Sequence, residues 1–77
     1  MSIRIGLEKS LQSIKDKIYS MFDLTKQSIW LSINYLLEGQ IDALEKIKDI
    51  EKHSDILNLE VQEECMTVLV RQQPVAK

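Results

Sequence analysis

The sequence contains few of the residues on which turn-rich or disulfide-rich small folds depend: one cysteine, one proline, two glycines and only 5% aromatic residues among its 77. Cys65 has no second cysteine to pair with, so an internal disulfide is excluded. Two glycines and one proline supply too few turns for a β fold of many strands. These absences, together with abundant leucine, isoleucine, glutamate and lysine, predict an all-α protein.

Long apolar runs and an excess of basic charge are also missing. Charged residues such as Lys15, Asp23 and Lys26 interrupt the first half, so no run of about 18 apolar residues exists to span a membrane. The N-terminus lacks the features of a signal peptide, which with the lone cysteine predicts a reducing, cytoplasmic location. The net charge is −2, and carboxylates outnumber lysines between residues 42 and 64, which argues against nucleic acid as a partner.

Apolar residues recur at spacings of three and four through most of the chain, the period of one face of an α-helix. They predict a helix over about residues 5–38 and a second over about residues 41–72. The first stripe consists of Leu7, Leu11, Ile14, Ile18, Phe22, Thr25, Ile29, Ile33 and Leu36. The second consists of Ile47, Ile50, Ser54, Leu57, Val61, Cys65 and Val68. Glycine commonly follows a helix end, so a turn is predicted at Gly39–Gln40. Pro74 disfavours the helical conformation in the residue before it, which ends the second helix near residue 72 and leaves a tail at 73–77.

Two helices of about 30 residues, each about 45 Å long, predict an antiparallel hairpin that forms a single domain over residues 1–77. We expect the two stripes to form its seam. A core of this size rarely stabilises a chain alone, and further apolar residues, assigned to an interface, lie outside the stripes. These are Trp30, Leu31, Tyr35, Ile56 and Leu59. We therefore expect a homo-oligomer, such as a four-helix bundle of two hairpins, or a bundle completed by a missing third helix.

Two carboxylates four residues apart, Glu51 and Asp55, are candidate metal ligands. At that spacing they lie one helical turn apart and can share one cation, and oxygen ligands suit hard metals or iron. Glu45 and Asp49 have the same spacing, as do Glu60 and Glu64, so spacing alone does not distinguish a metal site from a solvated helix face. Glu51 and Asp55 differ in lying on the flank of the apolar stripe. No motif of a nucleophile, a phosphate loop or a zinc enzyme is present, so no catalytic site is predicted.

The order of the acidic pair, Cys65 and the segment Arg71–Ala76, which contains Gln73-Pro74-Val75-Ala76, resembles the first three-helix repeat of the PhoU family, the accessory proteins of phosphate transport and phosphate signalling. The resemblance covers about residues 39–76. It implies that Glu51 and Asp55 belong to a metal-binding motif, with iron, zinc, manganese or magnesium as the candidate ions. It further implies a cytoplasmic regulator that contacts a phosphate ABC transporter, its ATPase subunit or a sensor kinase, and so lies at the inner face of the membrane.

Two departures from the family pattern leave alternatives open. Asn58 stands where many members have a glutamate, and the third helix, with its second acidic motif, is missing. Since a family-type cluster needs motifs from two helices, this chain carries half a metal site. It is interpreted as a truncated repeat, either naturally short or a fragment. The alternative function is that of a structural, oligomerising hairpin without a phosphate or metal role.

Overall fold

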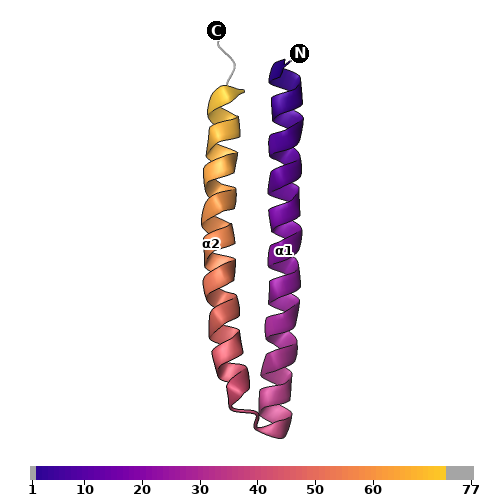
Figure 1. Cartoon of the computed structure of the whole chain (residues 1–77), viewed down its shortest axis with the longest axis vertical. Coiled ribbons are helices and arrows are strands. Elements are labelled where there is room, and N and C mark those ends of the chain that lie inside the picture. Colours follow the sequence, from indigo (N-terminus) through magenta and orange to yellow (C-terminus); the bar gives the residue numbers. More distant parts are fainter. Residues whose placement is uncertain (1, 73–77) are drawn as a thin grey trace.

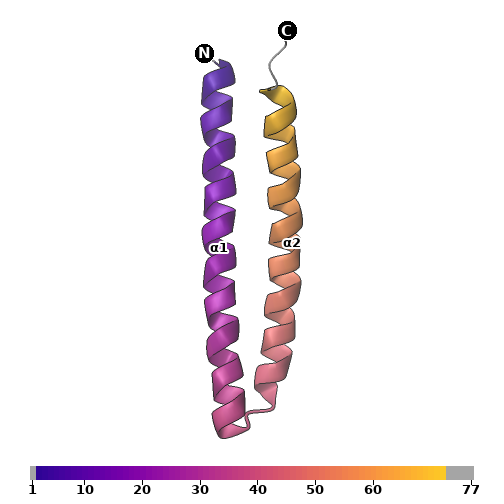
Figure 2. The ribbon, with the colours of Figure 1, turned by 180° about the vertical axis from the view of Figure 1, so that it is seen from behind.

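The computed structural model describes residues 2–72, which form two long helices and no strand (Figure 1). Helix α1 spans Ser2–Glu38 and helix α2 spans Asp42–Arg71. The helices lie side by side along their length in both views, with the described ends of the chain at the same end of the molecule (Figure 2). The molecule measures 59 × 18 × 15 Å. The predicted all-α antiparallel hairpin is therefore confirmed. The tail at 73–77 lies outside the described residues.

The chain reverses direction at Gly39, the residue after the last turn of α1. Its φ angle is +67°, a left-handed conformation that glycine adopts without the steric cost paid by other residues. The Gly39 N–H donates to the Tyr35 carbonyl at 2.9 Å and so satisfies one of the free carbonyls at the end of α1. Helix α2 then starts with Asp42 and Glu45 in its first turn, where carboxylates favourably face the positive end of the helix dipole.

The contact between the helices, here called the seam, has the period of a coiled coil. Its residues are buried or half-buried in most cases and alternate at spacings of three and four, an average of 3.5, which keeps two supercoiled helices in contact. In α1 the seam consists of Leu7, Ser10, Ile14, Lys17, Met21, Leu24, Ser28, Leu31 and Tyr35. In α2 it consists of Ala43, Ile47, Ile50, Ser54, Leu57, Val61, Glu64 and Val68. Only Ile14, at 8% exposure, and Ala43, at 2%, are buried hydrophobic residues within the described part of the chain.

The predicted stripe of α2 matches this seam except at Cys65, where the seam residue is Glu64, whereas only Leu7 and Ile14 of the predicted stripe of α1 lie in the seam. The α1 stripe begins at seam residue Leu7 but moves onto one flank, since Ile18 is 36% exposed, Phe22 67% and Leu36 79%. Its average spacing is close to 3.6 residues, the period of a straight helix. A seam that repeats every 3.5 residues stays on one side of the helix. A stripe with a period of 3.6 residues rotates around the helix by about 20° per heptad relative to that seam, so over four heptads it moves out of the contact. The most apolar face of α1 therefore lies uncovered beside α2.

Within residues 2–72, neither helix contains a stretch long and apolar enough to cross a membrane.

Candidate functional site

Glu51 and Asp55 lie one turn apart on α2, and both side chains are exposed. Glu51 follows seam residue Ile50 directly, and Asp55 follows Ser54, so both lie on the same side of the seam. Leu44 and Leu69 share that side of α2 and are 41% and 65% exposed. The carboxylate pair therefore lies in the middle of a line along the flank of α2 that is polar from Lys48 to Gln62 and apolar at its two ends.

The same side of the hairpin carries the displaced stripe of α1. In an antiparallel pair of helices, residues that follow the seam in each helix come to lie on one side of the molecule. We call the resulting surface the apolar flank, and its large exposed members are Leu11, Ile18, Phe22, Ile29, Leu36, Leu44 and Leu69. Glu51 and Asp55 thus lie in a surface that contains more exposed aliphatic and aromatic side chains than a solvated helix face would.

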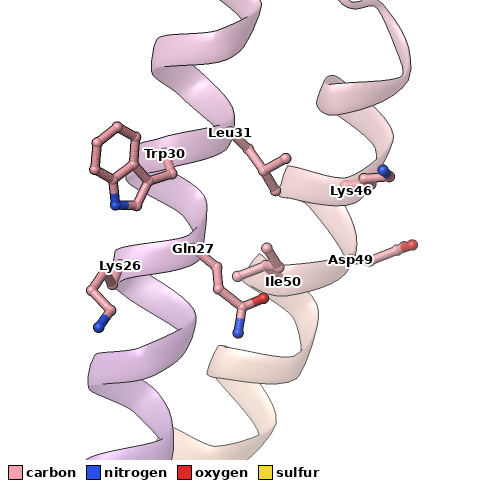
Figure 3. A pocket seen from close by; sticks show the side chains of 7 residues that line it. All are labelled: Lys26, Gln27, Trp30, Leu31, Lys46, Asp49 and Ile50. Atoms are coloured by element: carbon pink, nitrogen blue, oxygen red, sulfur yellow. The ribbon is translucent and has the colours of Figure 1, made fainter.

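The opposite side, the polar flank, is hollowed rather than apolar. An open pocket of about 530 Å³ lies there between the helices, and Figure 3 shows Leu31 and Ile50 at its base with Trp30 pointing away from α2. The remaining lining residues are Lys26, Gln27, Lys46 and Asp49. A second pocket on this flank joins Ser20 and Asp23 of α1 to His53 of α2. Lysine, aspartate and amide groups occur on this flank beside the exposed Trp30, Leu37, Ile56 and Val70.

The five residues predicted to form an interface do not share one surface. Trp30, Ile56 and Leu59 are 60%, 54% and 59% exposed, whereas Leu31 and Tyr35 are half-buried in the seam between α1 and α2. The exposed three lie on the polar flank and the back of the hairpin, away from the apolar flank. Their role in an oligomer stays a prediction.

As a metal site, the carboxylate pair is incomplete. Within residues 2–72 no group of three or more histidine, cysteine, aspartate or glutamate side chains is close enough to hold a metal ion. Glu51 and Asp55 supply two oxygen-bearing groups, whereas hard cations take about six oxygen ligands, partly from water. The donor set fits one edge of a metal site and needs further ligands from another helix or another molecule.

A cluster of polar groups inside the seam was missed by the sequence interpretation. Lys17 of α1 forms an ion pair with Glu64 of α2 and lies 3.4 Å from the Glu60 carboxylate. The Ser13 hydroxyl donates to Glu64 Oε2 at 3.2 Å. These hydrogen bonds, first from Lys17 and then from Ser13, lower the pKa of Glu64, and the bond to Glu64 is the main cause that raises the pKa of Lys17. The charged forms of both partners are therefore favoured in the folded hairpin.

This cluster also sets the register of the two helices. Its Glu64 carboxylate has one further oxygen, Oε1, that is shielded from solvent and has no hydrogen-bond partner. A shift of one helix by a turn would remove Lys17 from Glu64 and leave a half-buried charge unpaired, which is costly in a partly apolar contact. In the sequence, Lys17 and Glu64 continue the 3.5-residue spacing that runs through Ile14 and Leu57, and this spacing could have identified them as residues that face each other.

Comparisons with known proteins agree on one family. The family model described as PhoU domain matches residues 18–77. The phosphate-specific transport system accessory protein PhoU homolog of Synechocystis sp. is 30% identical over 74 residues, which cover 96% of this chain and 33% of the relative. The chain thus spans about a third of the length of this curated relative. No solved structure matches the chain significantly.

Proposed function

Because the chain belongs to the PhoU domain family, we propose that it acts as an accessory regulator of phosphate uptake or of phosphate-responsive signalling. It acts by contact with other proteins and not by catalysis. Its partners in this proposal are components of a phosphate ABC transporter or an associated sensor kinase. Such a regulator works in the cytoplasm, at the inner face of the membrane, where its partners expose their cytoplasmic parts.

One observation supports contact as the mode of action: the apolar stripe of α1 is uncovered along the hairpin. Phe22 is 67% exposed, Ile29 55% and Leu36 79%, and Leu69 of α2 continues the surface at 65%. Contiguous exposed apolar surface is rare on a soluble monomer and usually marks a protein contact. The pockets on the polar flank are open and shallow by comparison with this extended surface.

Metal binding is the finer part of the proposal. Glu51 and Asp55 supply carboxylates to an iron, zinc, manganese or magnesium ion, and further ligands come from a second helix or a second molecule. Because the carboxylates must be ionised to bind, the affinity falls as the pH falls toward their pKa values. Without a partner that completes the ligand set, the hairpin binds such ions weakly.

Calorimetric titration of Fe, Mn, Zn and Mg salts tests the metal assignment. The chain offers a matched control, because the exposed pair Glu45 and Asp49 has the same spacing on the same helix. We expect uptake to be lost in Glu51→Gln/Asp55→Asn and kept in Glu45→Gln/Asp49→Asn. Each double variant removes one like-charge pair, worth about 0.2–0.5 kcal/mol, and the Glu45 variant also loses a first-turn carboxylate worth about 0.3–1 kcal/mol, so the stability of both variants is measured beside their metal uptake. Equal uptake by wild type and the Glu51/Asp55 variant would remove these residues from the site.

Deletion of the gene in its source organism tests the regulatory role. We expect the rate of uptake of radiolabelled phosphate, or the output of a phosphate-responsive promoter, to change and to be restored by the wild-type chain. Binding of the purified chain to the transporter ATPase subunit and to the cytoplasmic part of the kinase identifies the partner. Unchanged uptake and promoter output, with no binding to either protein, would contradict the proposal and favour the second candidate, a structural, oligomerising hairpin. That candidate is favoured by one observation, the incomplete donor set around Glu51.

A further inference from the structure

The open pocket between the helices on the polar flank has the composition of a small-molecule site. Its volume of about 530 Å³ is within the range of about 300–1,000 Å³ found for ligand pockets in proteins. The half-buried side chains of Leu31 and Ile50 form an apolar base between α1 and α2 (Figure 3). Around this base lie one indole, two lysines, one amide and one carboxylate. Ligand pockets commonly combine such an apolar lining with a few polar groups that orient the ligand.

The charge around this pocket is positive, although the chain as a whole has a net charge of −2. Lys26 of α1 and Lys46 of α2 line the pocket from its two walls, and Asp49 is the one carboxylate among the lining residues. Within residues 2–72, neither lysine forms an ion pair or a hydrogen bond through its side chain. Each ammonium group is carried on a flexible four-carbon chain that can extend over the pocket, whereas the short side chain of Asp49 points away from α1 (Figure 3). The pocket therefore complements an anion.

Trp30 adds a surface for an aromatic ring. It is 60% exposed and lies one helical turn from Lys26 on the α1 wall of the pocket. Flat rings, nucleobases included, stack on exposed aromatic side chains without a specific pattern of hydrogen bonds. The Gln27 amide nitrogen donates to Asp23 Oδ2 at 2.8 Å, so the amide oxygen of Gln27 stays available to accept from a ligand. Groups for stacking, hydrogen bonding and charge attraction thus meet at one pocket.

We propose that this pocket binds a small aromatic anion, a flat ring that carries a negatively charged group, as in a mononucleotide. The ring covers the apolar base beside Trp30, and Lys26 and Lys46 attract the anionic group. Lysine forms charge-assisted hydrogen bonds with phosphate and carboxylate oxygens. The ring supplies contact area that inorganic phosphate lacks, and the anionic group supplies an attraction that an uncharged nucleoside lacks. Because the pocket is open and covers one face of the ligand, the binding is weak.

The position of the pocket leaves it open when the apolar flank is covered. Trp30 directly precedes seam residue Leu31, and Asp49 directly precedes Ile50, whereas the members of the apolar flank follow seam residues. The pocket and the apolar flank therefore lie on opposite sides of the seam. A ligand in the pocket binds independently of a protein contact on the apolar flank and of a metal ion at the carboxylate pair.

Fluorescence of Trp30 measures binding at the pocket directly, because Trp30 is the only tryptophan among the 77 residues. At low ionic strength, adenosine monophosphate added to the complete chain should change the Trp30 emission with a dissociation constant below about 1 mM. Adenosine, which has the ring without the charge, and inorganic phosphate, which has the charge without the ring, should each bind at least about tenfold more weakly. Benzoate separates two sources of the ligand: binding equal to that of adenosine monophosphate assigns the pocket to aromatic anions in general, and weaker binding assigns it to phosphate esters. No change in emission with either aromatic anion would overturn the proposal, as would equal binding of adenosine, phosphate and adenosine monophosphate.

A matched pair of double variants tests the two lysines. Lys26→Gln/Lys46→Gln removes the positive charges beside the pocket, whereas Lys15→Gln/Lys48→Gln removes one lysine from each helix on the opposite side of the seam. All four lysines are exposed, so both variants should keep the helical content of wild type, measured by circular dichroism. The first variant should raise the dissociation constant of adenosine monophosphate at least about tenfold, and the second should leave it within about threefold of wild type. Equal weakening in both variants would show an attraction to net charge alone and would overturn the proposal.

Trp30 also reports on other occupants of the pocket. It is 60% exposed in the hairpin, so the chain without ligand should emit at the long wavelength of a hydrated indole. Emission at a short wavelength that shifts to a longer one on dilution would place a second copy of the chain on the pocket and overturn the proposal. A change in phosphate uptake on gene deletion, together with no binding of either aromatic anion, would separate failure of this proposal from failure of the proposed function.

Discussion

The turn at Gly39 allows a sharp test of the hairpin, because the same substitution at the two glycines should have opposite effects. A Cβ atom added at Gly39 meets no other atom within 4 Å, so Gly39→Ala would change only the backbone preference. At a φ of +67° an L-residue pays about 1–2 kcal/mol relative to the right-handed helical conformation. We therefore expect Gly39→Ala to lower the free energy of unfolding by about 1 kcal/mol.

Gly6 is the internal control. It lies within α1, and a Cβ added there also meets nothing within 4 Å. Alanine is favoured over glycine in a helix by up to about 1 kcal/mol, so Gly6→Ala should raise the free energy of unfolding, by less than this limit because it lies near the helix end. Neither substitution touches the seam, the apolar flank or the carboxylate pair.

Urea unfolding followed by circular dichroism measures both effects at one protein concentration, which must be equal for all variants because association contributes to stability. A change of about 1 kcal/mol shifts the midpoint temperature of a chain of this size by about 4–8 °C, well above experimental error. Stabilisation by Gly39→Ala would refute the reasoning. It would indicate that Gly39 lies inside one continuous helix, where alanine is the better residue, and the hairpin would then be wrong.

Two further predictions concern the seam. Leu57 is half-buried in the seam, so Leu57→Ala should lower the free energy of unfolding, measured in urea, by about 2 kcal/mol. Leu59 is 59% exposed, so Leu59→Ala should lower it by less than about 0.5 kcal/mol. Equal losses would mean that the seam of α2 is misplaced. The pKa of Glu64 is lowered by its hydrogen bonds from Lys17 and Ser13, so this contribution is complete above the pKa of an unfolded-chain glutamate, about 4.3, and lost as the pH falls through the lower folded pKa. The pKa of Lys17 is raised chiefly by Glu64, so its contribution is present below the pKa of an unfolded-chain lysine and lost as the pH rises through the higher folded value. Glu64→Gln should flatten the acid limb of the unfolding free energy plotted against pH, and an unchanged acid limb would show that the ion pair does not form in solution.

The sequence alone determined the local structure of this protein. Leucine and isoleucine at spacings of three and four predict two helices, and Gly39 followed by an acidic first turn predicts where one helix ends and the next begins. The seam of α2 was also predictable, because its stripe from Ile47 to Val68 already has the 3.5-residue spacing of a supercoiled contact. Counting at 100° per residue placed Glu51 and Asp55 beside the stripe, in line with Leu44 and Leu69, as the structure has them.

Only the tertiary structure decided which face of α1 meets α2. The apolar stripe of α1 follows a straight helix, whereas two long helices stay in contact only along a 3.5-residue path, so the seam follows Ile14, Met21 and Leu24 and leaves Phe22 and Ile29 uncovered. The ion pair between Lys17 and Glu64 was hidden for the same reason, since it depends on which residues of two distant segments lie opposite one another. Local periodicity is a property of each helix, but the contact between helices depends on their relative rotation and register, and these are set by the pairing of both sequences at once.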